Sequence, residues 1–491
     1  MEKTSQRTIL FLIADTGAGH RSAANAIRNA ITLISQKEQE EWHARQQQST
    51  ESGAHAGKQP KTELSPAPPT YRIEIVDVFE EYSRFPLREA VKLYGPAIRY
   101  NPKMYGRVFH LSNEERSITA MQNVASPLVL NGLMRLITSV QPDVIVSIHP
   151  LLNQVTIKAL RRLHMHIPFL VVVTDLVSLH FAWLAHGADA YIVPTEQAKA
   201  LFLSRGFDPK LVHMLGMPID PKFTRPTENK EELRRKFGLA PGLPVVLLVG
   251  GGDGAGGLYD AARAISRARL SVQLLVITGR NKRLYAHLQR TRRSFHVPVK
   301  VFGFVQNMPE MMHASDVIIT KAGPGTINEA LACDLPIILS GYVPGQEEGN
   351  VDFVLKNDVG ILAYDSIELV DGLRRLVKPG SATMRRQVEN AKRLSRPYAS
   401  FDIANCILSF LPPADQSGLW QTIRVRKRRP IVSRTLRSSE ARLRALRRRL
   451  PRMSRASFLK SPVVSRLTRL RASGFSRGFI RLSAGGQDRE L

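Results

Sequence analysis

The chain has 491 residues, of which 43% are apolar, so it is long enough for two or three domains with large cores. Its formal charge of +28 indicates a polyanionic partner, either nucleic acid or anionic lipid. The two cysteines, Cys333 and Cys406, have no zinc-ligand spacing and exclude a disulfide framework. No stretch is long and apolar enough for a signal peptide or a membrane span, which predicts a cytosolic protein.

The first predicted strand and helix are joined by a glycine-rich turn. Residues 8–14 are expected to form a buried strand, residues 15–19 the turn, and residues 21–34 a helix with isoleucines on one face. His20 lies where the turn enters the helix, so its imidazole is a candidate general base, and local capping is the alternative. Residues 36–70 are polar and lack apolar periodicity, which predicts a flexible insertion.

Strands and helices keep alternating along the chain, as is typical of parallel sheets. Further strands are predicted at residues 71–78, 144–148, 169–173, 190–193, 245–249, 272–278, 299–302, 316–320 and 337–339. A charged stretch at residues 227–242 precedes the second series of strands, so a boundary near residue 225 divides a first domain, residues 1–225, from a second, residues 226–412. A last helix near residues 400–411 is expected to pack back onto the first domain. The predicted fold class is α/β, with two facing, doubly wound Rossmann-like domains and a cleft between them.

The glycine-rich turn of the first domain departs from the dinucleotide-binding fingerprint. Gly17 and Gly19 are present, but Ser22 stands where the third glycine belongs. The long polar insertion also disrupts the spacing to the acidic residue that would bind ribose. The pattern therefore argues against a nicotinamide-dependent dehydrogenase.

A second glycine-rich turn, residues 322–325, follows a predicted strand and precedes a predicted helix. The free N–H groups of the helix start, together with the missing side chains at Gly323 and Gly325, suit a phosphate, and Thr326 adds a hydroxyl donor. Glu329, one turn further on, is placed to accept hydrogen bonds from two ribose hydroxyls. The pattern indicates a nucleotide diphosphate site, with an ordinary structural turn as the alternative.

Six short motifs occur in an order that resembles one family of glycosyltransferases. They are GAGHRSAANAI at 17–27, TDL at 174–176, GGGDG at 250–254, GFV at 303–305, KAGPGT at 321–326 and GQEEGN at 345–350. Over roughly residues 8–410 the chain resembles the monogalactosyldiacylglycerol synthases and the bacterial diacylglycerol glucosyltransferases. The resemblance implies a GT-B fold, with a UDP-sugar site in the second domain and a diacylglycerol site in the first. UDP-glucose and UDP-galactose both remain open as donors.

The resemblance also implies roles for individual residues. Displacement with inversion at the sugar carbon would use His20 as the base, with Asp175 as the competing candidate. The predicted donor site comprises Gly251, Gly252, Asp253, Arg280, Phe304, Val305, Gly323, Pro324, Gly325, Thr326, Glu329, Gln346, Glu347 and Asn350. The predicted acceptor residues are Gly19, His149 and Trp183. No metal or other cofactor is expected, because the sequence has no DxD-type pair after a strand and helix N-termini can neutralise a diphosphate.

Two basic regions predict attachment to an anionic membrane surface. Residues 79–111 interleave aromatic and basic side chains, and the basic tail at residues 413–491 contains an amphipathic stretch at residues 439–450. Solvated helices and a tail that attracts RNA non-specifically are the alternatives, and no specific nucleic acid partner is expected. The expected location is cytoplasmic, peripheral on the inner face of the cell membrane.

The main prediction is therefore transfer of glucose or galactose from a UDP-sugar to diacylglycerol. Another lipid acceptor remains open. So does a UDP-sugar epimerase on the same fold, which would use the donor site without a lipid. A nucleic-acid-binding protein would instead use the tail and leave the donor site idle.

Overall fold

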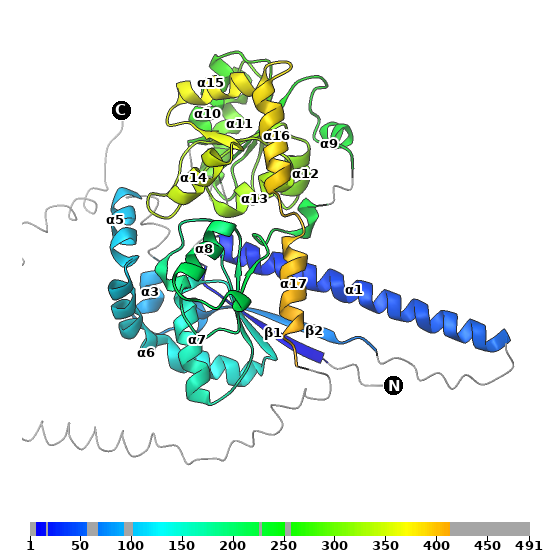
Figure 1. Cartoon of the computed structure of the whole chain (residues 1–491). Coiled ribbons are helices and arrows are strands. Elements are labelled where there is room, and N and C mark those ends of the chain that lie inside the picture. Colours follow the sequence, from blue (N-terminus) through cyan, green and yellow to red (C-terminus); the bar gives the residue numbers. More distant parts are fainter. Residues whose placement is uncertain are drawn as a thin grey trace, which may run out of the picture. The chain divides into compact units, whose positions relative to one another are not determined.

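Two parallel sheets, each with six strands, organise the part of the chain that the structure describes (Figure 1). The structure is a computed structural model, and it describes residues 6–15, 18–55, 67–92, 102–224, 228–250 and 257–412. No helix among these residues has the length and apolar character needed to cross a membrane.

The first sheet is built from the first half of the chain. Its strands are β1 (Gln6–Ile13), β2 (Thr70–Asp77), β3 (Val144–Ser147), β4 (Phe169–Val172), β5 (Ala190–Val193) and β6 (Val212–Met214). Their order in space is β2-β1-β3-β4-β5-β6, and each neighbouring pair is parallel. The carboxyl ends of β1, β3 and β4 therefore lie side by side at one edge of the sheet.

Helices cover both faces of the first sheet. They are α1 (Ala18–His55), α2 (Val78–Tyr82), α3 (Leu87–Lys92), α5 (Pro102–Ser112), α6 (Glu115–Val140), α7 (Pro150–Leu163) and α8 (Glu196–Ser204). Alternate side chains of β1 enter opposite cores, as strand geometry requires: Leu10 and Leu12 belong to one core, and Ile9 and Phe11 to the other. The helices α6 and α7 pack into the first of these cores, and α1 packs into the second.

The second sheet has the same construction. Its strands are β7 (Val245–Val249), β8 (Gln273–Ile277), β9 (Val299–Phe302), β10 (Val317–Thr320), β11 (Ile337–Leu339) and β12 (Gly360–Leu362), in the order β12-β11-β10-β7-β8-β9. Its helices are α9 (Lys230–Lys236), α10 (Leu258–Arg267), α11 (Lys282–Thr291), α12 (Met308–His313), α13 (Pro324–Ala332), α14 (Glu348–Lys356), α15 (Ser366–Val377) and α16 (Ala382–Leu394). Every residue of β7 is buried, because helices cover both faces of a parallel sheet. The predicted α/β class with two doubly wound sheets is confirmed.

The last helix, α17 (Ala399–Ser409), returns to the first sheet, as the sequence predicted. Ile403, Ala404 and Ile407 are fully buried in the same core as α1 and β1 (Figure 1). The Ser400 hydroxyl donates a hydrogen bond of 2.5 Å to the carbonyl of Ile219, which fixes the start of the helix. The core of the first sheet is therefore completed by a segment that follows the second sheet in the sequence.

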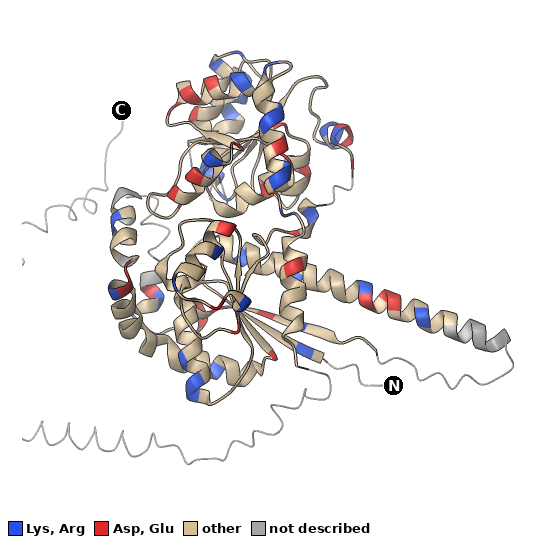
Figure 2. Cartoon of the chain, viewed as in Figure 1, with Lys and Arg blue, Asp and Glu red and all other residues tan. Residues whose placement is uncertain are grey.

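The prediction of a flexible insertion is wrong for residues 36–55, because α1 continues to His55. This half of the helix extends past the sheet, so it needs no apolar stripe. Charges of both signs lie along it (Figure 2). Glu41 pairs with Lys37 at 3.9 Å and with Arg45 at 3.3 Å, four residues away on either side. Such pairs, together with the high helix propensity of Gln, Glu, Lys and Arg, favour a helix without core contacts.

Other parts of the predicted organisation lie outside the described residues. These are residues 56–66 of the insertion, the domain boundary near residue 225, and the basic tail from residue 413 onward. The domain limits therefore remain predictions.

Candidate active site

Three polar side chains gather where β1, β3 and β4 end. His20 is the third residue of α1, which follows β1, and His149 directly precedes α7, which follows β3. The ring centroids of His20 and His149 are 4.7 Å apart. Nδ1 of His20 lies 3.2 Å from the hydroxyl oxygen of Thr174, which follows β4. The topology of the first sheet thus brings together residues separated by more than a hundred positions in the sequence.

His20, His149 and the neighbouring His180 are neutral at neutral pH. Burial lowers the pKa of His20 to about 4, partly opposed by a hydrogen bond with the Ile148 backbone and by Asp15. Burial also lowers the pKa of His180 to about 4 and holds the pKa of His149 well below its ordinary value, with His20 and His180 adding to the effect. A neutral imidazole has a free lone pair, so His20, which is half-buried, can accept a proton.

Asp175 is engaged by the segment that follows it. Its Oδ2 accepts a hydrogen bond of 2.7 Å from the indole nitrogen of Trp183, which is completely buried. Burial raises the pKa of Asp175 to about 6, while the bonds from Trp183 and from the backbone of His180 oppose that rise. This hydrogen bond therefore holds the loop between β4 and Trp183 in place. The predicted acceptor residue Trp183 is its donor.

On the second sheet, the predicted phosphate-binding turn leads directly into α13. Gly323 occupies the position before the helix, and no side chain caps the N-terminal N–H groups there. Pro324, Gly325 and Thr326 form the first turn and are partly exposed. Unpaired N–H groups at a helix start attract anions, so the geometry of this turn is compatible with the predicted phosphate site.

Glu329 lies one turn further along α13. Burial raises its pKa to about 7, and the charge of Asp220 adds to the rise. Asp220 itself accepts a hydrogen bond of 2.9 Å from the side chain of Asn29 on α1. Both protonation states of the Glu329 carboxyl group are therefore populated near neutral pH. A hydroxyl group that donates a hydrogen bond to it would favour the charged form.

Two of the residues predicted to bind the sugar, Glu347 and Asn350, are engaged in polar contacts within the protein. Glu347 is buried; it pairs with Lys321 through Oε1 and accepts a bond of 2.8 Å from the Val343 N–H through Oε2. Asn350 is buried as well and donates a bond of 2.9 Å to the carbonyl of Ala322. Gln346 is half-buried next to them. These contacts draw the loop before α14 onto the turn before α13.

The remaining donor predictions fall in two places. The guanidinium of Arg280 lies over the ring of Phe304, 5.7 Å from its centroid, and both side chains are exposed next to half-buried Val305. This arrangement offers a flat, cationic surface of the kind that stacks with a planar ring. Gly251, Gly252 and Asp253 lie outside the described residues.

Close contacts join the first-sheet loops to the start of α14. Leu176, directly after Asp175, is buried in the apolar core under the second sheet. A side chain at Gly349 would collide with Ser178, and one at Gly345 would lie 2.9 Å from the ring of Phe109 on α5. Asp175 therefore lies three residues before Ser178, which contacts the start of α14 next to the predicted sugar-binding residues. Gly19, the other predicted acceptor residue, is exposed beside His20.

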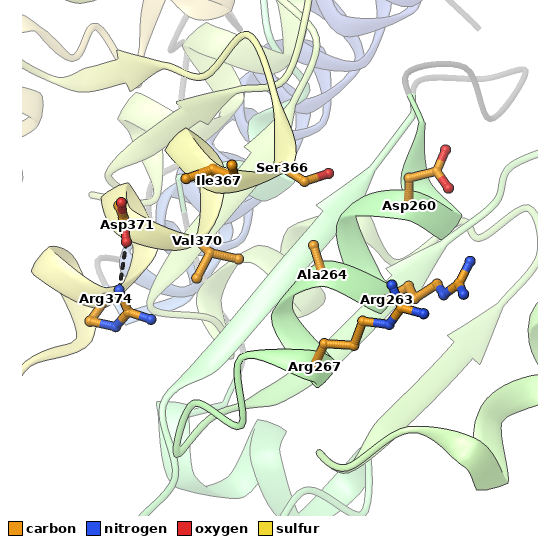
Figure 3. Close-up of a pocket in the computed structure, with 9 residues that line it drawn as sticks. All are labelled: Asp260, Arg263, Ala264, Arg267, Ser366, Ile367, Val370, Asp371 and Arg374. Carbon is orange, nitrogen blue, oxygen red and sulfur yellow. Dashed lines mark hydrogen bonds and ion pairs between the residues drawn. The ribbon is translucent and has the colours of Figure 1, made fainter.

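A groove on the second domain lies apart from these residues. It runs between α10 and α15 and contains Arg263, Arg267 and Val370, with Asp371 paired to Arg374 on its α15 side (Figure 3). None of the residues predicted from the sequence as site residues lines it. The described residues also contain no group of three or more side chains suited to a metal ion, and the expectation of a metal-free enzyme remains a prediction.

Sequence reasoning missed three residues of the site: Thr174, His180 and Lys321. Thr174 and Lys321 are parts of the TDL and KAGPGT motifs, so their position within the motifs was a usable signal. His180 carried no signal, because its place beside His149 depends on the path of the loop after β4.

Two family models match this chain. The model described as monogalactosyldiacylglycerol (MGDG) synthase matches residues 64–219, and the model of the glycosyltransferase family 28 C-terminal domain matches residues 245–397. The first match covers β2 to β6 of the first sheet, and the second covers all six strands of the second sheet.

Named relatives are similar along most of the chain. A probable monogalactosyldiacylglycerol synthase 2 of Oryza sativa subsp. japonica is 35% identical over 414 residues, covering 82% of this chain and 80% of the relative. Monogalactosyldiacylglycerol synthase 3 of Arabidopsis thaliana is 34% identical over 414 residues, covering 82% and 81%. Both are named as chloroplastic, so the predicted location on the inner face of the cell membrane is wrong.

Among solved structures, a co-structure of S. aureus MnaA with UDP is similar in fold, with a TM-score of 0.50 and 15% identity over 82% of this chain and 97% of the other. The two doubly wound sheets and this likeness confirm the GT-B fold that the sequence predicted. The relatives confirm a UDP-sugar-dependent hexosyltransferase and favour it over an epimerase. The chain belongs to the monogalactosyldiacylglycerol synthase family.

Proposed function

We propose that this enzyme transfers galactose from UDP-galactose to the free hydroxyl of diacylglycerol, with inversion at the sugar carbon. Galactose is preferred over glucose because the relatives are named for galactolipid synthesis. The observation that carries the proposal is the meeting of His20, His149 and Thr174 at the carboxyl ends of adjacent strands, next to the loop that contacts Gly349. Ligands of open α/β sheets bind at such strand ends.

His20 is the proposed base. The acceptor hydroxyl oxygen attacks the anomeric carbon, the bond from that carbon to UDP breaks, and the hydroxyl proton moves to the imidazole. His20 is neutral and half-buried, so its lone pair is available for the proton, while burial lowers its pKa and makes it a weaker base than a free imidazole. Asp175 is the weaker candidate, because its carboxyl group already accepts bonds from Trp183 and from the His180 backbone. Asp175 instead keeps the loop after β4 in place.

The donor would lie along the second sheet. In this proposal the diphosphate meets the N-terminal N–H groups of α13, and Glu329 accepts hydrogen bonds from the ribose hydroxyls. The exposed pair of Arg280 and Phe304 would face the uracil ring. The electrostatic advantage is that backbone dipoles stabilise the negative charge of the departing UDP without reorganising.

The acceptor lipid requires a membrane, and the first domain offers an apolar surface for one. Phe85 is 79% exposed, Leu111 at the end of α5 is 69% exposed, and Val124 on α6 is 77% exposed. The exposed arginines Arg84 and Arg107 lie in the same stretch of chain. Apolar side chains next to cations suit the interface of an anionic membrane, so we assign membrane contact to this surface.

Sugar transfer to diacylglycerol in anionic vesicles tests the proposal. Labelled UDP-galactose and UDP-glucose are supplied in parallel without added metal, the lipid products are separated by chromatography, and the anomeric configuration of the product is determined by NMR. We expect a β-linked galactolipid, which is the inverted product of an α-linked donor. A product of α configuration would contradict inversion. Preference for UDP-glucose would contradict the assigned sugar.

A further inference from the structure

The Lys321–Glu347 pair links the two segments of the proposed donor site. Lys321 directly follows β10, and Glu347 directly precedes α14. The Glu347 side chain is 6% exposed, and both of its oxygens have partners, the Lys321 ammonium and the Val343 N–H. A carboxylate has about four acceptor sites, so these two partners fix the Glu347 side chain while its predicted role with sugar hydroxyls stays a prediction.

The ammonium group of Lys321 lies beside the start of α13. Its Nζ is 3.5 Å from the point that a Cβ atom at Gly323 would occupy, and Oε1 of Glu347 is 3.9 Å from the same point. The Lys321 side chain is 33% exposed, so the ammonium is accessible from solvent. An ammonium has three N–H donors, and the bond to Glu347 uses one of them. The group is therefore able to bind a second anion at this place.

We propose that Lys321 binds the diphosphate of the UDP-sugar, and that Glu347 is a positioning residue that holds the ammonium beside α13. This inference rests on the proposed function, because it places the diphosphate at the same turn. Before the UDP-sugar binds, a cation in a partly buried site needs a paired anion, since an unpaired charge there is strongly destabilising. The diphosphate then adds charge-assisted hydrogen bonds to an ammonium that is already in position.

Calorimetric titration with UDP and with uridine tests the assignment, because uridine lacks the diphosphate. The proteins compared are the unaltered full chain, Lys321→Met, and the double variant Lys321→Met with Glu347→Gln. The double variant removes both charges, so it avoids leaving a buried carboxylate without a partner. Lys356→Met is the matched control, because it breaks an exposed ion pair with Asp352 on α14.

We expect the double variant to lose about tenfold or more in UDP affinity while its uridine affinity stays unchanged, as the loss of a charged hydrogen bond predicts. The control should bind both ligands normally. UDP affinity equal to that of the unaltered chain would show that Lys321 only neutralises Glu347, and would overturn the inference. An equal loss for UDP and uridine would reveal a purely structural pair and overturn it too. Failure of the unaltered chain to bind UDP would instead refute the donor site of the proposed function, and this inference with it.

Discussion

Gly349, the second residue of α14, lies against Ser178 in the loop after β4 so closely that no side chain fits between them. The loop that contains Ser178 also contains Thr174 and Asp175, and α14 begins next to Glu347. The contact therefore connects the histidine cluster of the first sheet to the loop assigned to the sugar.

A methyl group at Gly349 should disturb this connection. We expect Gly349→Ala to lower both the melting temperature and kcat/KM, because its Cβ would overlap the Ser178 hydroxyl and backbone, and overpacking of this kind costs about 1–3 kcal/mol. Thermal unfolding and sugar transfer measure the two effects. Asp352→Ala, an exposed change on the same helix, is the control. Unaltered kcat/KM in Gly349→Ala would show that the contact does not matter for catalysis.

The role of His20 predicts a loss of turnover without a loss of donor binding. His20→Ala should lower kcat by about 10²–10⁴, the usual contribution of a general base, and leave the Kd for UDP unchanged. Steady-state transfer assays and calorimetry measure the two quantities. His43→Ala changes an exposed histidine in the outer half of α1 and should have no effect. Wild-type turnover in His20→Ala would remove His20 as the base.

Asp175 should tolerate a neutral replacement that keeps its hydrogen bond. In Asp175→Asn the amide oxygen can still accept from Trp183, so we expect kcat within about tenfold of the wild type. Asp175→Ala leaves the buried indole N–H without an acceptor and should destabilise the fold by about 1–3 kcal/mol. Denaturant unfolding and transfer assays distinguish the two variants. If Asp175→Asn were as inactive as His20→Ala, Asp175 would be the base.

The raised pKa of Glu329 predicts a pH dependence of stability. The folded chain holds a proton on this carboxyl group up to about pH 7, whereas the unfolded chain releases it near 4.5. The contribution of Glu329 to the free energy of unfolding therefore falls as the pH rises from about 4.5 to about 7. Glu329→Gln should thus gain melting temperature relative to the wild type at pH 8 but not at pH 4, and should bind UDP more weakly.

Exposed Glu389→Gln on α16 serves as the control for Glu329→Gln. A constant difference in melting temperature between Glu329→Gln and the wild type at both pH values would contradict the raised pKa. Unchanged UDP affinity would contradict the ribose role.

The apolar surface of the first domain predicts a specific defect in membrane binding. The double variant Leu111→Ser with Val124→Ser should sediment less with anionic vesicles, because it removes two strongly exposed apolar side chains. Leu355→Ser is the control, since Leu355 is 44% exposed but lies on α14 in the second domain. If the wild type, the double variant and Leu355→Ser sedimented equally, this surface would be excluded as the membrane contact.

The strands that the sequence revealed are those with uninterrupted Val, Ile and Leu, such as β7, because burial on both faces requires such runs. The strands β6 and β12 were missed because His213 and Gly360 interrupt their short apolar runs, whereas the equally short but wholly aliphatic β11 was predicted. The outer half of α1 was missed because ion pairs rather than core contacts favour it.

Within the site, sequence motifs identified single residues but not their partners. The bond of Asp175 to Trp183 and the pair of Lys321 with Glu347 depend on how loops fold back, and no local pattern encodes that. The motif GQEEGN suggested that Glu347 faces the sugar, whereas the structure gives its carboxylate two protein partners.

The return of α17 to the first sheet has a practical consequence for dissecting the enzyme. A fragment that ends after β6 would expose the apolar groove that Ile403 and Ile407 fill, and a fragment that begins at α9 would carry α17 as an unpaired apolar helix. The two halves are therefore not separable expression units. A soluble acceptor half would need α17 grafted onto its carboxyl end through a linker, and chimaeras between relatives should exchange α17 together with β1 and α1.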